Sequence, residues 1–167
     1  WKNIVIIQPT LALLDETRRK MQKYTTDYKL IVRTSQTSSL EKGNIYLFTA
    51  ERVNEYNFPV KVEFLIIDEF YKLSGSRDDE RSSSLNNAFY KLYWKFKPQF
   101  YFLGPNIDGV SKGFLEYYNA VFYSSDCSLV DSRVIDVYPN YPDQIGNRGK
   151  KRDFTENLLF QLLLEHS

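Results

Sequence analysis

Short apolar runs alternate along the chain with longer amphipathic segments, and this alternation limits the folds that are open to it. The run at 63–68 (EFLIID) is apolar almost throughout, as is typical of a strand buried on both faces. We predict strands at 3–8, 29–33, 44–48, 63–68, 99–103 and 133–138, and helices at 10–24, 49–56, 85–97, 112–121 and from 153 onward. Strands that alternate with helices predict an α/β fold, in which helices cover both faces of a mostly parallel sheet.

Composition excludes several classes of protein. Hydrophobic residues make up 43% and charged residues 26% of the 167 residues, which is typical of one folded domain with a sizeable core. No apolar run approaches the roughly 18 residues of a membrane span. With a single Cys127 and no signal peptide pattern, we predict a cytoplasmic protein with no membrane partner. The single His166 argues against Ser-His-Asp and Cys-His nucleophile systems and against multi-histidine metal sites.

Polar segments divide the chain. The stretch 74–84 (SGSRDDERSSS) has few apolar residues and is predicted to be a loop. The stretch 139–152 is rich in Pro, Asn, Gly and basic residues and is predicted to be a linker. Asp153 and Glu156 form a capping-box pair at the start of the last helix. The formal net charge of +1 gives no overall attraction to nucleic acid.

Two adjacent carboxylates, Asp68 and Glu69, stand where the apolar strand 63–68 ends. In parallel sheets the chemistry gathers at the carboxyl ends of the strands, so this position is a candidate site. A P-loop ATPase uses such a pair to hold Mg²⁺ and to polarise the attacking water. Two ordinary surface acids at a solvated strand end are the alternative, and for the dipeptide alone this alternative is favoured.

Three segments in order carry a resemblance to a known family. Gln8–Leu13 (QPTLAL) resembles the segment in which a helicase strand ends in Pro-Thr before a helix. Thr49–Val53 (TAERV) resembles the Thr-Pro-Glu-Arg-Leu segment that follows the next strand but one. Asp68–Leu73 (DEFYKL) resembles the box that names the DEAD/DEAH-box helicases. On these motifs the chain looks like the first RecA-like motor domain of such a helicase, a P-loop NTPase.

The resemblance implies roles for particular residues. Asp68 would bind Mg²⁺ and Glu69 would act as the catalytic base. The residues expected to hold the backbone of a nucleic acid strand are Pro9, Thr10, Thr49, Glu51 and Arg52. Both threonines precede predicted helices, so simple N-capping explains them equally well, and capping is compatible with a phosphate contact. The motif that couples hydrolysis to unwinding would be Gly104, Pro105 and Asn106.

The chain departs from the family pattern at three places. Tyr71 stands where the family has His or Asp, and Gly104-Pro105-Asn106 stands where Ser-Ala-Thr is usual. No Gly-x-x-x-x-Gly-Lys-Ser/Thr loop is present, because the nearest match, 104–111, carries Val110 in place of the lysine. We therefore expect a RecA-like sheet that is incomplete at its N-terminus, and a fragment that does not hydrolyse ATP alone.

The predicted organisation follows from these observations. Residues 1–138 would form the partial RecA-like domain, 139–152 the linker, and 153–167 a helix that leads toward a second RecA-like domain. Mg²⁺ and ATP are the cofactors expected in the full-length protein, with none bound tightly to the fragment. Single-stranded or duplex nucleic acid, DNA or RNA, is the expected partner.

Two other functions are compatible with the sequence. One is a non-catalytic nucleic-acid-binding or scaffold domain derived from such a motor, which the missing lysine favours. The other is a Mg²⁺-dependent nuclease that uses Asp68, Glu69 and Asp108.

Overall fold

The computed structural model describes residues 2–23, 26–70, 80–105, 107, 109–125, 138–141, 143–146 and 148–165. The chain divides into two compact units, Trp1–Ser124 and Ser125–Ser167. No helix in the described part of the chain combines the length and the apolar character that crossing a membrane requires.

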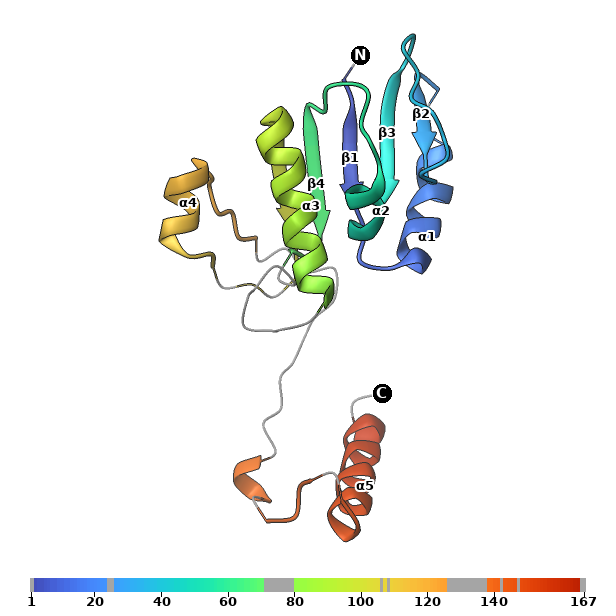
Figure 1. Cartoon of the computed structure of the whole chain (residues 1–167). Helices are drawn as coiled ribbons and strands as arrows, with labels where there is room; N and C mark the ends of the chain where they lie inside the picture. The colour runs from blue at the N-terminus through green and yellow to red at the C-terminus, as the bar shows by residue number, and fades with distance from the viewer. Residues whose placement is uncertain are drawn as a thin grey trace. The chain divides into compact units, whose positions relative to one another are not determined.

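The first unit is built on a five-stranded sheet in the order β2-β3-β1-β4-β5, and every pair is parallel. Figure 1 shows the strand arrows pointing the same way. The strands are β1 (Ile4–Ile7), β2 (Tyr28–Ile31), β3 (Gly43–Phe48), β4 (Phe64–Asp68) and β5 (Gln99–Leu103). The helices are α1 (Leu11–Gln22), α2 (Ala50–Glu55), α3 (Glu80–Phe96) and α4 (Lys112–Tyr118). The predicted α/β fold is confirmed, and the arrangement is consistent with a RecA-like three-layer domain.

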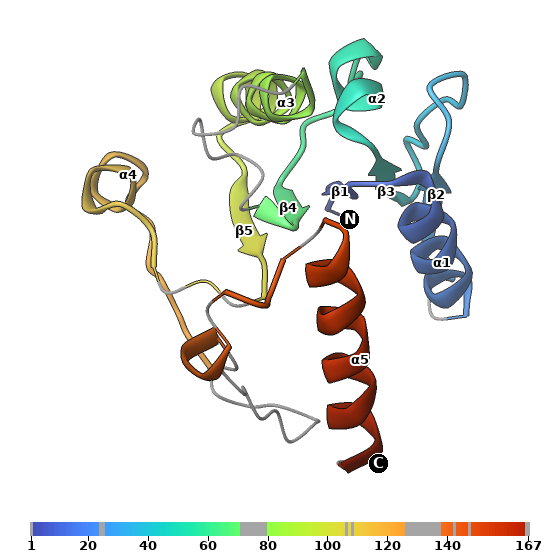
Figure 2. The same cartoon turned by 90° about the horizontal axis from the view of Figure 1, so that it is seen from below.

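Helices α2 and α3 cover one face of the sheet, which we call the first face (Figure 2). Alternate residues of the strands point into this layer. Val5 and Ile7 of β1 lie beside Leu65 and Ile67 of β4 and are buried with them. The main core is completed by apolar side chains from both helices and from the segment before β4, among them Val53, Phe58, Ala88, Phe89 and Leu92.

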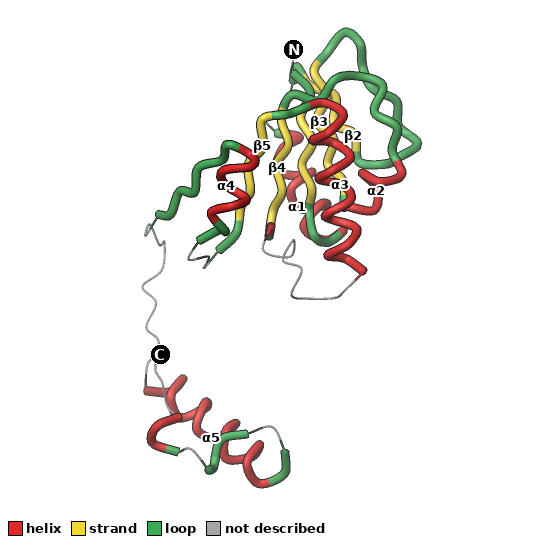
Figure 3. Tube along the Cα trace, turned by 60° about the vertical axis from the view of Figure 1, so that its left-hand side comes forward, coloured by secondary structure: helices red, strands yellow, loops and turns green. Residues whose placement is uncertain are grey.

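Helix α1 lies on the opposite face, which we call the second face, so helices stand on both sides of the sheet (Figures 2 and 3). It packs near β3, and Leu14 is its one buried residue. Helix α4 instead joins the first-face layer. The Phe114 ring lies 5.8 Å from Phe102, and the Tyr118 ring lies 5.0 Å from Tyr93 of α3.

Most predicted elements lie within one to three residues of the observed ones, and the largest difference is at α3. The polar stretch 74–84 was expected to be a loop, but α3 already begins at Glu80. Ser82 is buried inside this helix, so its small side chain serves the packing there. Helix α4 ends earlier than expected, because Asn119 adopts a left-handed conformation and caps it. The predicted strand 133–138 falls outside the described residues except for Tyr138, which begins the short 3-10 helix η2 (Tyr138–Asn140).

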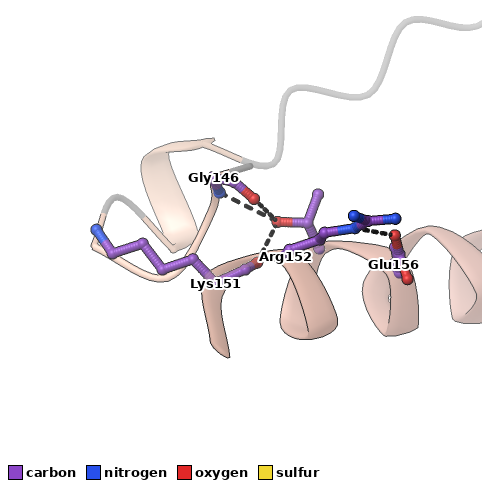
Figure 4. A network of polar contacts seen from close by, with 5 residues as sticks. Gly146, Lys151, Arg152 and Glu156 are labelled. Atoms are coloured by element: carbon purple, nitrogen blue, oxygen red, sulfur yellow. Dashed lines mark hydrogen bonds and ion pairs between the residues drawn. The ribbon is translucent and has the colours of Figure 1, made fainter. Parts of the chain in front are cut away.

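The second unit contains η2 and helix α5 (Lys150–Glu165). The predicted capping box at Asp153 is wrong, because α5 begins three residues earlier and Glu156 accepts a hydrogen bond from the Arg152 side chain at 2.8 Å. The preceding turn is tied to the helix by one hydroxyl (Figure 4). Thr155 Oγ1 accepts from the Gly146 N–H at 3.1 Å and lies 2.7 Å from the Lys151 carbonyl, to which it donates.

Candidate functional site

The carboxyl ends of the parallel strands bring the predicted site residues to one edge of the sheet. Ile7 is paired with Phe48 of β3 and with Ile67 of β4, and Asp68 is paired with Leu103 of β5. The segments that follow these strands therefore leave the same edge, which we call the carboxyl edge. They carry Pro9, Thr10, Thr49, Glu51, Arg52, Asp68, Glu69, Gly104 and Pro105, whereas Asn106 lies outside the described residues.

Thr10 is the N-cap of α1. Its backbone is extended, with φ −141° and ψ 154°, and its Oγ1 accepts a hydrogen bond from the Leu13 N–H at 3.3 Å. The side chain is exposed, so the first turn of α1 opens to solvent at the carboxyl edge. The structure thus shows the capping role that the sequence allowed, and a phosphate contact at the same helix start stays a prediction.

Thr49 and Arg52 belong to the start of α2. Thr49 is the N-cap, but its side chain makes no capping hydrogen bond, and only its carbonyl accepts from the Val53 N–H. Arg52 is half-buried, and its Nη1 donates to the Val32 carbonyl at 2.8 Å. This bond joins α2 to the end of β2, so Arg52 has a structural role beside any contact with a ligand. Glu51 is exposed in the first turn.

Asp68 and Glu69 form a tight turn at the end of β4. Asp68 Oδ1 accepts a hydrogen bond from the Glu69 N–H at 3.0 Å. Glu69 has a φ of 55°, in the left-handed region that a residue with a side chain occupies at a cost of roughly 1–2 kcal/mol. Backbone strain of this kind is frequent at functional sites. The turn is thus a feature that packing of the strand alone does not explain.

The metal prediction at Asp68 is not strengthened by its surroundings. Among the described residues, no group of three or more His, Cys, Asp or Glu side chains gathers to hold an ion. The Mg²⁺ role of Asp68 stays a prediction, because Mg²⁺ is usually held by one or two carboxylates together with waters and phosphates and not by a cluster of protein ligands. The nuclease alternative needed Asp108, which lies outside the described residues.

Gln8 is a feature of this edge that the site prediction did not include. It is 6% exposed, its backbone N–H donates to the Phe48 carbonyl, and its Nε2 lies 3.4 Å from Thr17 Oγ1 of α1. Its Oε1 is the one buried side-chain oxygen or nitrogen without a hydrogen bond in the described structure. The sequence indicated Gln8 only by its place as a polar residue at the end of an otherwise apolar strand.

Three basic residues of α1 are paired with acidic residues of the same helix. Arg18 and Arg19 are paired with Asp15 at 2.8 and 2.7 Å, and Lys20 is paired with Glu16 at 2.6 Å. The Arg18 hydrogen bond is the main reason that the pKa of Asp15 lies below its usual value. These are exposed pairs within one helix, and they are typical of a solvated helical surface.

Comparison with known proteins identifies a relative. The chain is 39% identical over 138 residues to anti-bacteriophage protein B of Escherichia coli strain K12, an alignment that covers 77% of this chain. The match covers 19% of that protein, so the chain spans about a fifth of the length of the relative. No protein-family model matches the chain, and no solved structure matches it.

This comparison corrects the family prediction. The relative is named for action against bacteriophage and not as a helicase, and no family model supports the DEAD/DEAH-box resemblance. The identification of the chain as a DEAD/DEAH-box helicase domain was therefore wrong. Three short motifs placed after strands of a parallel sheet were too little to define a family. The residue roles taken from that resemblance, and the expected Mg²⁺ and ATP, stay untested predictions.

Proposed function

We propose that this chain is a domain of a larger protein that protects a bacterial cell against bacteriophage. The observation that carries the proposal is the 39% identity to anti-bacteriophage protein B. The alignment covers 77% of this chain, so the similarity extends over most of its length. Since the match covers 19% of the relative, the domain would act together with other parts of a longer polypeptide.

Within that protein we assign to the carboxyl edge the binding of a nucleic acid backbone, without nucleotide turnover by this domain. Helix N-termini favour anions because their free N–H groups and the helix dipole attract negative charge. The exposed start of α1 at Thr10 offers such groups. Arg33 is exposed just beyond β2 and adds a positive charge near the same edge. Phosphate contacts of this kind position a strand without reading its sequence.

The defence role is tested by infecting bacteria that express the longer protein containing this chain. We expect fewer plaques than in cells with an empty vector, for at least one phage in a diverse panel. Deleting residues 2–124 should abolish the protection while the remaining protein is still detected by immunoblot. Full protection after this deletion would remove the domain from the defence function.

The carboxyl-edge role is tested with the 167-residue chain and two substitutions of the same residue. Asp and Asn are both good N-caps, so Thr10→Asp and Thr10→Asn should preserve α1. Only Thr10→Asp places a negative charge against a bound phosphate, and we expect it to weaken binding of a fluorescent oligonucleotide roughly tenfold. Thr26→Asp is the matched control, because Thr26 is exposed and precedes β2 at the opposite edge of the sheet.

Separate titrations with single-stranded DNA, single-stranded RNA and duplex identify the polymer. A lost phosphate contact should also reduce the slope of log K against log salt by about one. Equal binding by Thr10→Asp, Thr26→Asp and the unmodified chain would refute the assignment of the carboxyl edge.

A further inference from the structure

The second face of the sheet carries a row of apolar side chains from three neighbouring strands. The register places Ile6 of β1 beside Ile66 of β4, and Ile66 beside Tyr101 of β5. Because side chains alternate between the two faces, these residues point away from the core under α2 and α3. Their neighbours two positions along each strand share this face. The second-face patch consists of Ile4, Ile6, Phe64, Ile66, Tyr101 and Leu103.

The exposure of side chains on the second face can be compared between β3, on which α1 packs, and β5. At β3, where α1 packs, Ile45 and Leu47 point to the second face and are 3% and 0% exposed. At β5 the corresponding Tyr101 and Leu103 are 46% and 51% exposed. The difference does not come from residue type, because both pairs are large and apolar. Among the described helices of the first unit, cover therefore reaches β3 and does not extend to β5, which is the edge strand of the sheet.

No other described helix of the first unit covers the patch. Helices α2 and α3 lie on the first face, and α4 contacts the first-face rings Phe100 and Phe102 (Figure 2). The patch is also ordered by its own contacts: the rings of Phe64 and Tyr101 stack at 6.4 Å with an interplanar angle of 25°. The apolar patch therefore has its own ring contact already formed in the described structure.

All-parallel sheets occur almost entirely with both faces covered, because each face is apolar and the crossover helices lie over it. A contiguous apolar surface that is left open on such a sheet indicates an interaction site. The relative is about five times longer than the matched segment, since the match covers 19% of it. A longer polypeptide of that kind has ample chain to supply a further helix for the second face.

Polar residues at the carboxyl end of the patch indicate which kind of side chain a partner should carry there. Gln8 and Asp68 follow Ile6 and Ile66 on the same face by the same alternation. The Asp68 carboxylate is only half-buried, so it favours a partner that brings a hydrogen-bond donor to this end. An occupant is therefore favoured if its surface is apolar over most of its length and carries a hydrogen-bond donor at this end.

We propose that the second-face patch is the docking site of an amphipathic α-helix supplied by the remainder of a longer polypeptide. The helix lies over β1, β4 and β5 beside α1 and completes the second helical layer. Its apolar stripe covers Ile66 and Tyr101, and a donor side chain lies at the end near Gln8. The inference rests on the part of the proposed function that places the chain in a larger protein, and it is independent of nucleic acid binding.

The test compares the reactivity of single thiols in the 167-residue chain and in the longer protein. In a Cys127→Ser background, Tyr101→Cys reports on the patch. Tyr90→Cys is the matched control, because Tyr90 is also a tyrosine, is 47% exposed and lies on α3 at the first face. We expect both thiols to be alkylated quickly by iodoacetamide in the short chain. In the longer protein the thiol at 101 should react at least about tenfold more slowly, as expected when a reactive group becomes accessible only by local opening.

Equal reactivity of the thiol at 101 in the two proteins would overturn the proposal. Slow reaction already in the short chain would also overturn it. In that case a dependence on protein concentration would assign the patch to a second copy, and independence of concentration would assign it to this chain itself. If Tyr101→Cys does not fold, as judged by circular dichroism, Leu103→Cys replaces it. The outcome does not depend on phage protection or on oligonucleotide binding, so its failure is distinguishable from failure of the proposed function.

Discussion

Lys91 of α3 forms hydrogen bonds to the end of α2, and replacing it should lower the stability of the first unit strongly. Its Nζ donates to three backbone carbonyls, those of Val53, Asn54 and Tyr56, at 3.0, 2.6 and 3.0 Å. These carbonyls belong to the last turn of α2 and to its C-cap, where a helix leaves acceptors without intrahelical partners. One ammonium group thus satisfies most of the open end of a six-residue helix.

The magnitude follows from opposing contributions in Lys91→Met. A hydrogen bond to a charged group contributes about 1.5–3 kcal/mol, but the three bonds share one ammonium. Burial lowers the pKa of Lys91, with a smaller contribution from Lys95, which shows that folding already disfavours the charge. Methionine retains an apolar stem of similar length, so the packing loss is small. We expect the free energy of unfolding to fall by about 2–3 kcal/mol, which for a unit of this size corresponds to a fall of roughly 8–12 °C in Tm.

The matched control is Lys95→Met on the same helix. Lys95 is exposed, and its Nζ donates to one carbonyl, that of Phe58, at a longer 3.3 Å. We expect this variant to lose no more than about 1 kcal/mol. Both variants would be compared by urea unfolding followed by far-ultraviolet circular dichroism at pH 7. Equal losses for the two variants would show that the three carbonyl bonds of Lys91 do not hold α2 in place.

Three further predictions concern the first unit. Burial and then the Tyr90 hydroxyl raise the pKa of Tyr118 to about 12, so its stabilising contribution is present below pH 10 and is lost as the pH rises toward 12. Between about pH 9 and pH 11.5, the free energy of unfolding measured with urea should fall less for Tyr118→Phe than for the unmodified chain. Gly43→Ala should cost about 1–3 kcal/mol, since its Cβ would lie 2.4 Å from the Tyr28 ring, and a neutral result in thermal unfolding would contradict this close approach. Gly113→Ala in α4 has nothing within 4 Å of the new Cβ and should instead stabilise by about 0.5–1 kcal/mol, so an equal effect of both alanines would refute the argument.

The strands were predictable because each is a compact apolar run bounded by polar residues. The run 99–103 was located to the residue, and 63–68 within one residue. The start of α3 was not predictable in this way, because its first turns carry charged and serine residues that also suit a loop. Tertiary packing determines where α3 begins, since Ser82 and Leu85 are buried against the rest of the unit.

The position of the candidate site could also be predicted, but not its contacts. Parallel pairing alone brings Thr10, Thr49 and Asp68 to one edge, so the alternation of strands and helices was sufficient for that inference. The bond from Arg52 to the Val32 carbonyl joins residues twenty positions apart and has no local sequence pattern. The capping bond at Thr10, in contrast, is local and was anticipated.

The carboxyl edge and the second-face patch form one continuous surface, and this continuity links the two proposals physically. Asp68 follows Ile66 on the second face, and the tight turn at Glu69 begins where the patch ends. A helix that docks on the patch would therefore exclude water beside this turn and strengthen every electrostatic interaction there, because the local dielectric falls when water is excluded. A cation on the docked helix at this end would offset the charge of the Asp68 carboxylate, whereas a neutral donor would not. It follows that oligonucleotide affinity measured on the 167-residue chain is a lower limit for the longer protein if the docked helix carries a cation, and an upper limit if it does not.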